Sequence, residues 1–216
     1  MSVVRINIGC GQTPTAGWTN YDNSPSVKLA SRPALAGLLG RFRLLVPAQR
    51  EFIAMAQQQG IRYADAVRHI PHPDRSVDVV YTSHMVEHLD RDEVTRFLRE
   101  VRRVLVPGGI IRIAVPDLRF HVDRYLDKAD ADLFVEGVRL GRMRPKGLKQ
   151  RVAGAVIGDR EHHWMYDGPS MCKLLASAGF AGARVVPSGS TTIPNPGALD
   201  LAERSPESVF VEASNA

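Results

Sequence analysis

The segment SHMVEHLD, residues 83–90, brings together two histidines and a glutamate that could do chemistry. If it is helical, His84 and His88 lie four residues apart and share one helix face. The H-x-x-E-H spacing can then hold zinc, with Glu87 as a general base. A zinc site needs a third protein ligand, and Glu161 is available further along the chain. The alternative is that the segment lines a metal-free site of another kind.

A second chemical signal is the glycine-rich turn GCG, in which Gly9 and Gly11 follow the short apolar segment VVRINI. A turn without side chains lets a ligand approach the backbone closely. Asp22 ends the next strand-like segment, where a carboxylate can accept hydrogen bonds from both hydroxyls of a ribose. By itself, G-x-G fits a tight turn and a surface aspartate nearly as well.

The elements that must position these residues alternate along the chain. Apolar runs bounded by turn residues predict strands, and apolar residues at helical spacing predict helices. We expect strands at 3–8, 18–22, 61–66, 76–83, 110–116, 183–187 and 208–213, and helices at 33–59 with a break at Pro47, 90–105, 119–128 and 168–179. This alternation predicts a parallel α/β sheet. The last two strands have no helix between them, which indicates an antiparallel end.

The connection between the first two strands is unusually short. Only seven residues, Gln12 to Trp18, lie between Gly11 and the TNYD part of the second strand, whereas a parallel crossover normally needs a dozen or more. We therefore expect the first crossover helix to be reduced to about one turn. A helix start that binds phosphate would be damaged by this change, which argues against NAD as the cofactor.

The composition is that of a soluble globular chain of 216 residues with a formal net charge of +5. It has two cysteines and neither a transmembrane run nor a signal-peptide layout, so we expect a cytoplasmic protein. The length fits a single domain, 1–216, with insertions or lid elements at 30–60 and 129–160. No nucleic-acid-binding motif accompanies the positive charge, and a nucleic-acid partner is not expected.

Two long stretches carry a family resemblance. YADAVRHIPHPDRSVDVVYTSHMVEHL, followed by LREVRRVLVPGGIIRIAVPD, is similar to the core of class I S-adenosylmethionine-dependent methyltransferases. It looks most like the type-11-like branch associated with glycan and cell-surface polymer synthesis. INIGCG resembles the first motif and GWTNYD the second, and the resemblance covers residues 3–128 and 162–213. It implies a Rossmann-like, doubly wound, mostly parallel seven-stranded sheet with an antiparallel C-terminal strand.

The resemblance also implies a cofactor, S-adenosylmethionine, and a place for it. Gly9, Cys10 and Gly11 would pass along the cofactor and Asp22 would bind its ribose. Asp65 and Ala66 would flank the adenine, and Ser83 and His84 would line the methionine end. In such proteins the E-H-L segment lines the cleft without metal, so no metal site is expected. One departure is Asn7, which stands where many relatives have an acid.

The reaction implied is methyl transfer to an acceptor that the sequence does not identify, such as a sugar, a glycan precursor or a small metabolite. An oxygen acceptor must lose a proton, and His88 and His162 are the favoured bases. Histidines that only bond backbone carbonyls are the alternative for each. A non-catalytic S-adenosylmethionine-binding protein is the alternative function, and a zinc hydrolase is a more distant one.

Residues 137–151, GVRLGRMRPKGLKQR, are basic and contain no acid. Such a block is often a solvated face. It also stands after strand 110–116 and shortly before His162, where it could act as a lid over the acceptor. The block would then select an anionic acceptor or contact an anionic membrane surface. The oligomeric state does not follow from the sequence.

Overall fold

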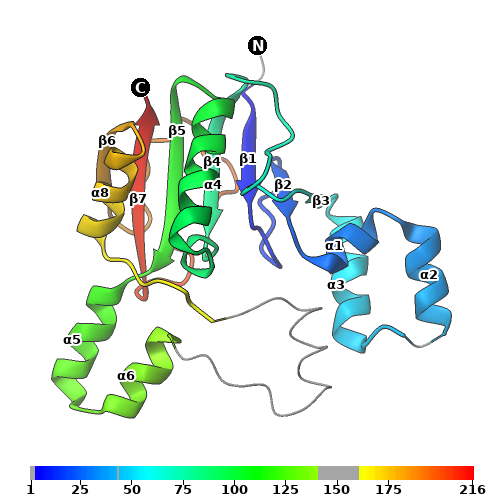
Figure 1. The fold of residues 1–216 in the computed structure, drawn as a ribbon, viewed down its shortest axis with the longest axis horizontal. Helices are drawn as coiled ribbons and strands as arrows, with labels where there is room; N and C mark the ends of the chain where they lie inside the picture. Colours follow the sequence, from blue (N-terminus) through cyan, green and yellow to red (C-terminus); the bar gives the residue numbers. More distant parts are fainter. Residues whose placement is uncertain (1–2, 43, 141–160) are drawn as a thin grey trace.

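The computed structural model describes residues 3–42, 44–140 and 161–216. These residues form a seven-stranded sheet in the order β3-β2-β1-β4-β5-β7-β6 (Figure 1). The strands are β1 Arg5–Ile8, β2 Thr19–Asp22, β3 Arg62–Tyr63, β4 Val77–Ser83, β5 Leu105–Pro116, β6 Phe180–Val186 and β7 Ser208–Asn215. The first five are parallel, and β7 runs antiparallel between β5 and β6. The predicted fold class is confirmed.

The predicted helices are also present, with two additions. The helices are α1 Pro25–Ala30, α2 Pro33–Arg41, α3 Pro47–Gln58, α4 Arg91–Val104, α5 Leu118–Lys128, α6 Ala131–Val138 and α8 Gly168–Ser177, and a 3₁₀ turn, η1, spans Val86–His88. Pro47 begins α3, so the expected break in the helical region 33–59 is correct. Asp90 caps α4 and forms a capping box with Glu93. The short helices α1 and α6 were not predicted as separate elements.

One face of the sheet is covered by α4 and α8 (Figure 1). The apolar residues of α4 recur at helical spacing and pack against alternate residues of β4 and β5. Phe97 and Val101 of α4 are fully buried, as are Val80 and Ile111 of the sheet. This cluster is the largest apolar core in the described residues, and it holds the parallel strands in register.

The opposite face is covered largely by loops. Residues 9–18, between β1 and β2, form turns and no helix, so the predicted reduction of the first crossover helix is confirmed and goes further than the one turn expected. In place of a helix, the long connection between β6 and β7 lies over this face. Ile193 and Leu199 of that connection pack with Trp18, Tyr81 and other sheet residues.

Two groups of helices lie outside the sheet (Figure 1). The helices α1, α2 and α3 pack together beside β2 and β3, and α5 and α6 follow the carboxyl end of β5. The helices α2 and α3 fall within 30–60 and α6 falls within 129–160, most of which lies outside the described residues. The insertions at these two regions and the single domain over 1–216 stay predictions. No helix in the described ranges is long and apolar enough to cross a membrane.

Candidate functional site

The glycine turn lies directly after β1, and its backbone requires glycine. Gly9 has φ +71° and Gly11 has φ +49°, both in the left-handed region. The amide of Gly9 donates to the carbonyl of Tyr21, which joins the turn to β2. A Cβ atom at Gly9 would lie 2.6 Å from Cγ of Met85, whereas a Cβ at Gly11 would meet nothing within 4 Å. The turn is therefore closed on one side and open on the other.

Asp22, at the end of β2, is held against this turn. Its Oδ2 accepts a hydrogen bond of 3.1 Å from the amide of Gly11, and its Oδ1 accepts one of 2.8 Å from the amide of Ser24. A carboxylate has about four acceptor positions, so these two bonds orient the group without using all of them. The structure thus brings the predicted turn and the predicted acid together at the carboxyl edge of the sheet.

The side chain of Asn7, in β1, is hydrogen bonded to the short loop that connects β1 to β2. This side chain is buried, and Nδ2 donates to Thr15 Oγ1 at 3.2 Å and to the carbonyl of Thr13 at 3.4 Å. A carboxylate at this position could accept hydrogen bonds but could not donate them. The Thr15 hydroxyl could also donate to an acid, but the carbonyl of Thr13 can only accept, so an amide can bond both groups where a carboxylate could bond only the hydroxyl.

Cys10 packs between the turn and the neighbouring helices. It is 3% exposed and lies in an apolar cluster with Val27, Ala56 and Ile61. Burial, and then the charge of Asp22, raise the pKa of the Cys10 thiol to about 12. The thiol therefore stays protonated at neutral pH and is not a nucleophile.

The two residues predicted to flank an adenine follow β3. The amide of Ala64 donates to the carbonyl of Asp22, so this segment runs beside the end of β2. The Asp65 carboxylate forms an ion pair of 3.2 Å with the exposed Arg68. Ala66 is buried in the main core, and it could contact a ligand only through its backbone. A cofactor role for Asp65 and Ala66 stays a prediction.

At the end of β4, the chain does not form the helix that an H-x-x-E-H zinc site needs. Ser83 is the last residue of the strand, and His84 has φ +48°, in the left-handed region. Glu87 and His88 then lie in the 3₁₀ turn η1, so His84 and His88 do not share an α-helical face. His84 Nε2 is also hydrogen bonded to Ser208 Oγ at 2.9 Å. The helical arrangement that the alternative H-x-x-E-H zinc site requires is therefore not formed by this segment.

The two predicted bases are brought together from distant parts of the sequence. The rings of His88 and His162 pack edge to face, with centroids 5.2 Å apart. His88 Nδ1 is hydrogen bonded to the carbonyl of Glu161, and His162 Nδ1 to the carbonyl of Val138, each at 2.9 Å. Burial lowers the pKa of His162.

Glu87 contacts several residues around the histidine pair, and the sequence analysis did not predict these contacts. It is fully buried, and its carbonyl accepts hydrogen bonds from the amides of His163 and Trp164 at 2.7 and 3.2 Å. Its carboxylate oxygen Oε1 lies 3.3 Å from His84 Nδ1 and 3.9 Å from His88 Nε2. The adjacent E-H pair and the later E-H-H were visible in the sequence, but only the fold shows that they meet.

The predicted basic lid lies mostly outside the described residues. Arg142, Arg144, Lys146, Lys149 and Arg151 all fall within residues 141–160. Arg139 is described, and its carbonyl accepts a hydrogen bond of 3.1 Å from the amide of His162. The beginning of the basic block therefore adjoins the histidine pair.

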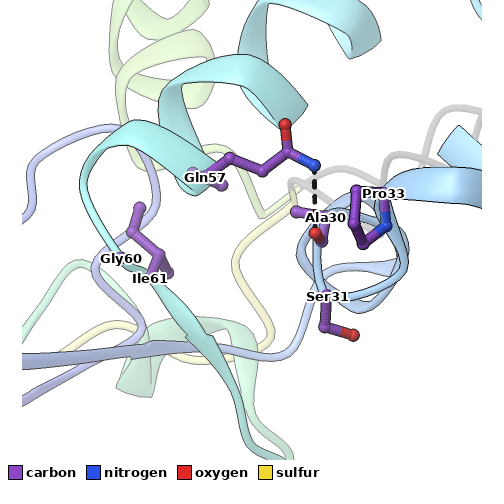
Figure 2. A pocket seen from close by; sticks show the side chains of 7 residues that line it. Ala30, Ser31, Pro33, Gln57, Gly60 and Ile61 are labelled. Carbon is purple, nitrogen blue, oxygen red and sulfur yellow. Dashed lines mark hydrogen bonds between the residues drawn. The ribbon is translucent and has the colours of Figure 1, made fainter. Parts of the chain in front are cut away.

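A cavity of about 420 Å³ lies elsewhere, between α1 and the end of α3 (Figure 2). Its lining is Ala30, Ser31, Pro33, Ala56, Gln57, Gly60 and Ile61. Figure 2 shows Gln57 reaching across to the carbonyl of Ala30, with a hydrogen bond of 3.1 Å. The lining contains no acid or histidine and none of the predicted site residues, so we do not assign the chemistry to it.

Comparison with known proteins identifies similar domains and folds. Residues 44–113 match the model of a family described as a methyltransferase domain. No curated protein matches the sequence. Among solved structures, a SAM-dependent methyltransferase of Thermotoga maritima, named as a possible histamine N-methyltransferase, has a TM-score of 0.53 at 14% identity and covers 100% of this chain and 84% of its own.

Two further solved structures share the fold. A SAM-dependent methyltransferase of Archaeoglobus fulgidus has a TM-score of 0.51 at 14% identity, with 99% of this chain and 86% of its own covered. One from Methanosarcina mazei has a TM-score of 0.50 at 14% identity, with 99% and 93% covered. The chain has the fold of class I S-adenosylmethionine-dependent methyltransferases. The domain match and the fold together support an S-adenosylmethionine-dependent methyltransferase, with S-adenosylmethionine as the cofactor.

Proposed function

We propose that this protein transfers the methyl group of S-adenosylmethionine to an acceptor bound at the carboxyl edge of β4 and β5. The observation that carries the proposal is the contact between the amide of Gly11 and the carboxylate of Asp22. It sets a glycine turn with an open side next to an acid whose remaining lone pairs suit ribose hydroxyls. Ligands of open α/β sheets bind at this edge.

The roles proposed for the surrounding residues follow from their positions. The backbone of Gly9, Cys10 and Gly11 borders the cofactor, and Asp22 binds its ribose. Asp65 and the backbone of Ala66 lie at the adenine, and Ser83 and His84 lie at the methionine end. The bound cofactor supplies an electrophilic methyl group, and the protein contributes mainly by aligning the acceptor with it.

The histidine pair is suited to take a proton from an acceptor hydroxyl. A backbone carbonyl can only accept, so Nδ1 of His88 and of His162 carries the hydrogen, and Nε2 keeps its lone pair. Because burial lowers the pKa of His162, this ring is neutral at lower pH than an exposed histidine. We therefore place the proton acceptor at Nε2 of His88 or His162.

A titration with S-adenosylmethionine, followed by transfer of a labelled methyl group to phosphorylated and neutral saccharides and small metabolites, tests this function. We expect His88→Gln or His162→Gln to lower kcat by about 100-fold or more, with cofactor affinity unchanged. His163→Gln, at the exposed neighbouring position, is the matched control. Because the base acts when deprotonated, kcat should rise with pH, and the lowered pKa of His162 places that rise below the usual histidine range.

The outcomes separate the alternatives. Absence of cofactor binding would contradict the proposal. Cofactor binding without transfer to any acceptor would favour a non-catalytic S-adenosylmethionine-binding protein.

We further propose that the acceptor is anionic, such as a phosphorylated sugar or glycan precursor. Two described cations support this. Arg139 adjoins His162 through its carbonyl, and the guanidinium of Arg91 lies 5.0 Å from the ring centroid of Trp164. The net charge of +5 also favours an anionic partner.

Arg139→Glu is expected to raise KM for an anionic acceptor about fivefold at low salt, because it replaces an attractive charge with a repulsive one. The difference from the wild type should shrink as salt is added, and KM for the cofactor should not change. Arg184→Glu, at the exposed edge strand β6, carries the same change of charge and serves as the control. Equal effects of both variants would show that only the net charge matters and would contradict a specific contact.

A further inference from the structure

Glu87, His88 and His162 form a cluster with the composition of a metal site. One ligand atom from each residue lies within 4.8 Å of the other two. The Glu87 side chain is fully buried, and neither of its carboxylate oxygens has a hydrogen-bond partner. A buried carboxylate without partners is costly, because burial removes its water and nothing replaces it. The contacts of the carboxylate with His84 Nδ1 at 3.3 Å and His88 Nε2 at 3.9 Å provide no hydrogen bond, so both of its oxygens could still bind a cation.

Backbone carbonyls determine which nitrogen of each histidine ring is available to bind a metal ion. Each Nδ1 donates its hydrogen to a backbone carbonyl, that of Glu161 for His88 and that of Val138 for His162. Each Nε2 is then an acceptor, and His88 Nε2 lies 3.9 Å from Glu87 Oε1. The three groups thus present lone pairs toward one another. His84 Nδ1 also approaches Oε1, at 3.3 Å, yet no hydrogen bond satisfies the carboxylate.

We propose that this cluster binds one divalent first-row transition-metal ion through the Glu87 carboxylate and the Nε2 atoms of His88 and His162. Imidazole nitrogen with one carboxylate oxygen suits Zn²⁺, Fe²⁺, Co²⁺ or Mn²⁺, whereas Mg²⁺ and Ca²⁺ prefer sites built from oxygen alone. The carbonyls of Glu161 and Val138 fix the ring tautomers, as outer partners of metal-bound histidines commonly do. Three protein ligands leave coordination positions open for water or another oxygen ligand.

This site differs from the H-x-x-E-H arrangement. It uses the glutamate and the second histidine of that segment and recruits His162 from 74 positions further along the chain. A bound ion would connect η1, the end of α6 and the segment 161–164, which already share backbone hydrogen bonds. A nitrogen that binds the ion cannot accept a proton. In the loaded protein the ion would instead lower the pKa of an acceptor hydroxyl bound to it, and the proton would pass to solvent water.

Direct metal titration tests the inference without any activity assay. The full-length protein is stripped with a chelator, dialysed, and titrated with Zn²⁺ by calorimetry and with Co²⁺ by visible absorption. We expect one ion per chain, cobalt bands typical of nitrogen and oxygen ligands, and a rise in Tm on loading. Glu87→Gln and His162→Gln should each weaken binding by about 100-fold, whereas His163→Gln should bind like the wild type.

A variant could also lose metal binding because it misfolds. The heat stability of Glu87→Gln distinguishes this from the loss of a metal ligand. The substitution removes a buried charge without partners, so the metal-free variant should be at least as stable to heat as the metal-free wild type. The inference is overturned if the wild type binds no stoichiometric ion, or if binding is unchanged in both Glu87→Gln and His162→Gln. It does not rest on methyl transfer, because the S-adenosylmethionine titration is a separate measurement that either result leaves unaffected.

Discussion

Replacing Arg112 with methionine is expected to lower the free energy of unfolding by about 3–5 kcal/mol. Arg112 of β5 and Glu212 of β7 are both buried and form an ion pair of 2.6 Å. Arg112 also donates to the carbonyls of Ser190 and Leu201 in the connection between β6 and β7. Removing the arginine would leave the Glu212 carboxylate buried without its cation. Urea unfolding followed by circular dichroism measures the loss.

Arg119→Met is the matched control for this prediction. Arg119 and Asp123 form an ion pair of 2.9 Å with similar chemistry, but both side chains are exposed. Exposed pairs contribute about 0–1 kcal/mol, so the control should unfold almost like the wild type. The double variant Arg112→Met with Glu212→Leu should recover part of the loss, since no charge is left buried. A loss in Arg112→Met no larger than in the control would contradict the argument.

Asp22→Ala is expected to weaken S-adenosylmethionine binding by about 1–3 kcal/mol, or roughly fivefold to 150-fold. The substitution removes charge-assisted hydrogen bonds to the ribose and also the acceptor for the amides of Gly11 and Ser24. Isothermal titration calorimetry measures the affinity, with Tm recorded for each variant.

Asp78→Ala separates binding from stability. Asp78 likewise accepts a hydrogen bond from a backbone amide, that of Val4, at 2.7 Å. It lies near the start of β4, at the amino edge of the sheet, where no ligand is placed. This variant should lose stability but keep its cofactor affinity. If Asp22→Ala also keeps its affinity while folded, the ribose assignment is wrong.

Much of the fold could be predicted because its signals are local. The apolar run at β4, the capping box of Asp90 and Glu93, and Pro47 at the start of α3 each depend on neighbouring residues. The same holds for the glycine turn and Asp22, since each follows a recognisable strand. Gly11 and Asp22 lie together because the carboxyl ends of neighbouring parallel strands meet at one edge of the sheet.

The features that were missed depend on contacts between distant segments. The end of β4 at Ser83 was predicted correctly, but the left-handed backbone at His84 and the 3₁₀ turn that follows it were not. The spacing of H-x-x-E-H could not show these two features, because packing against other segments decides the backbone conformation there. The convergence of Glu87 with His162 and the pairing of Arg112 with Glu212 also have no local signature.

The loop-covered face of the sheet has a consequence for the order in which the protein can be completed during synthesis. Tyr81 and Arg112 are synthesised before their carboxylate partners Glu203 and Glu212, which follow 122 and 100 positions further along the chain, respectively. Until then the hydroxyl and the guanidinium lack these carboxylates, and β5 has an open edge where β7 will pair. Chains truncated before β7 should therefore be prone to aggregate. The native state of this face becomes available only after β7 has been synthesised.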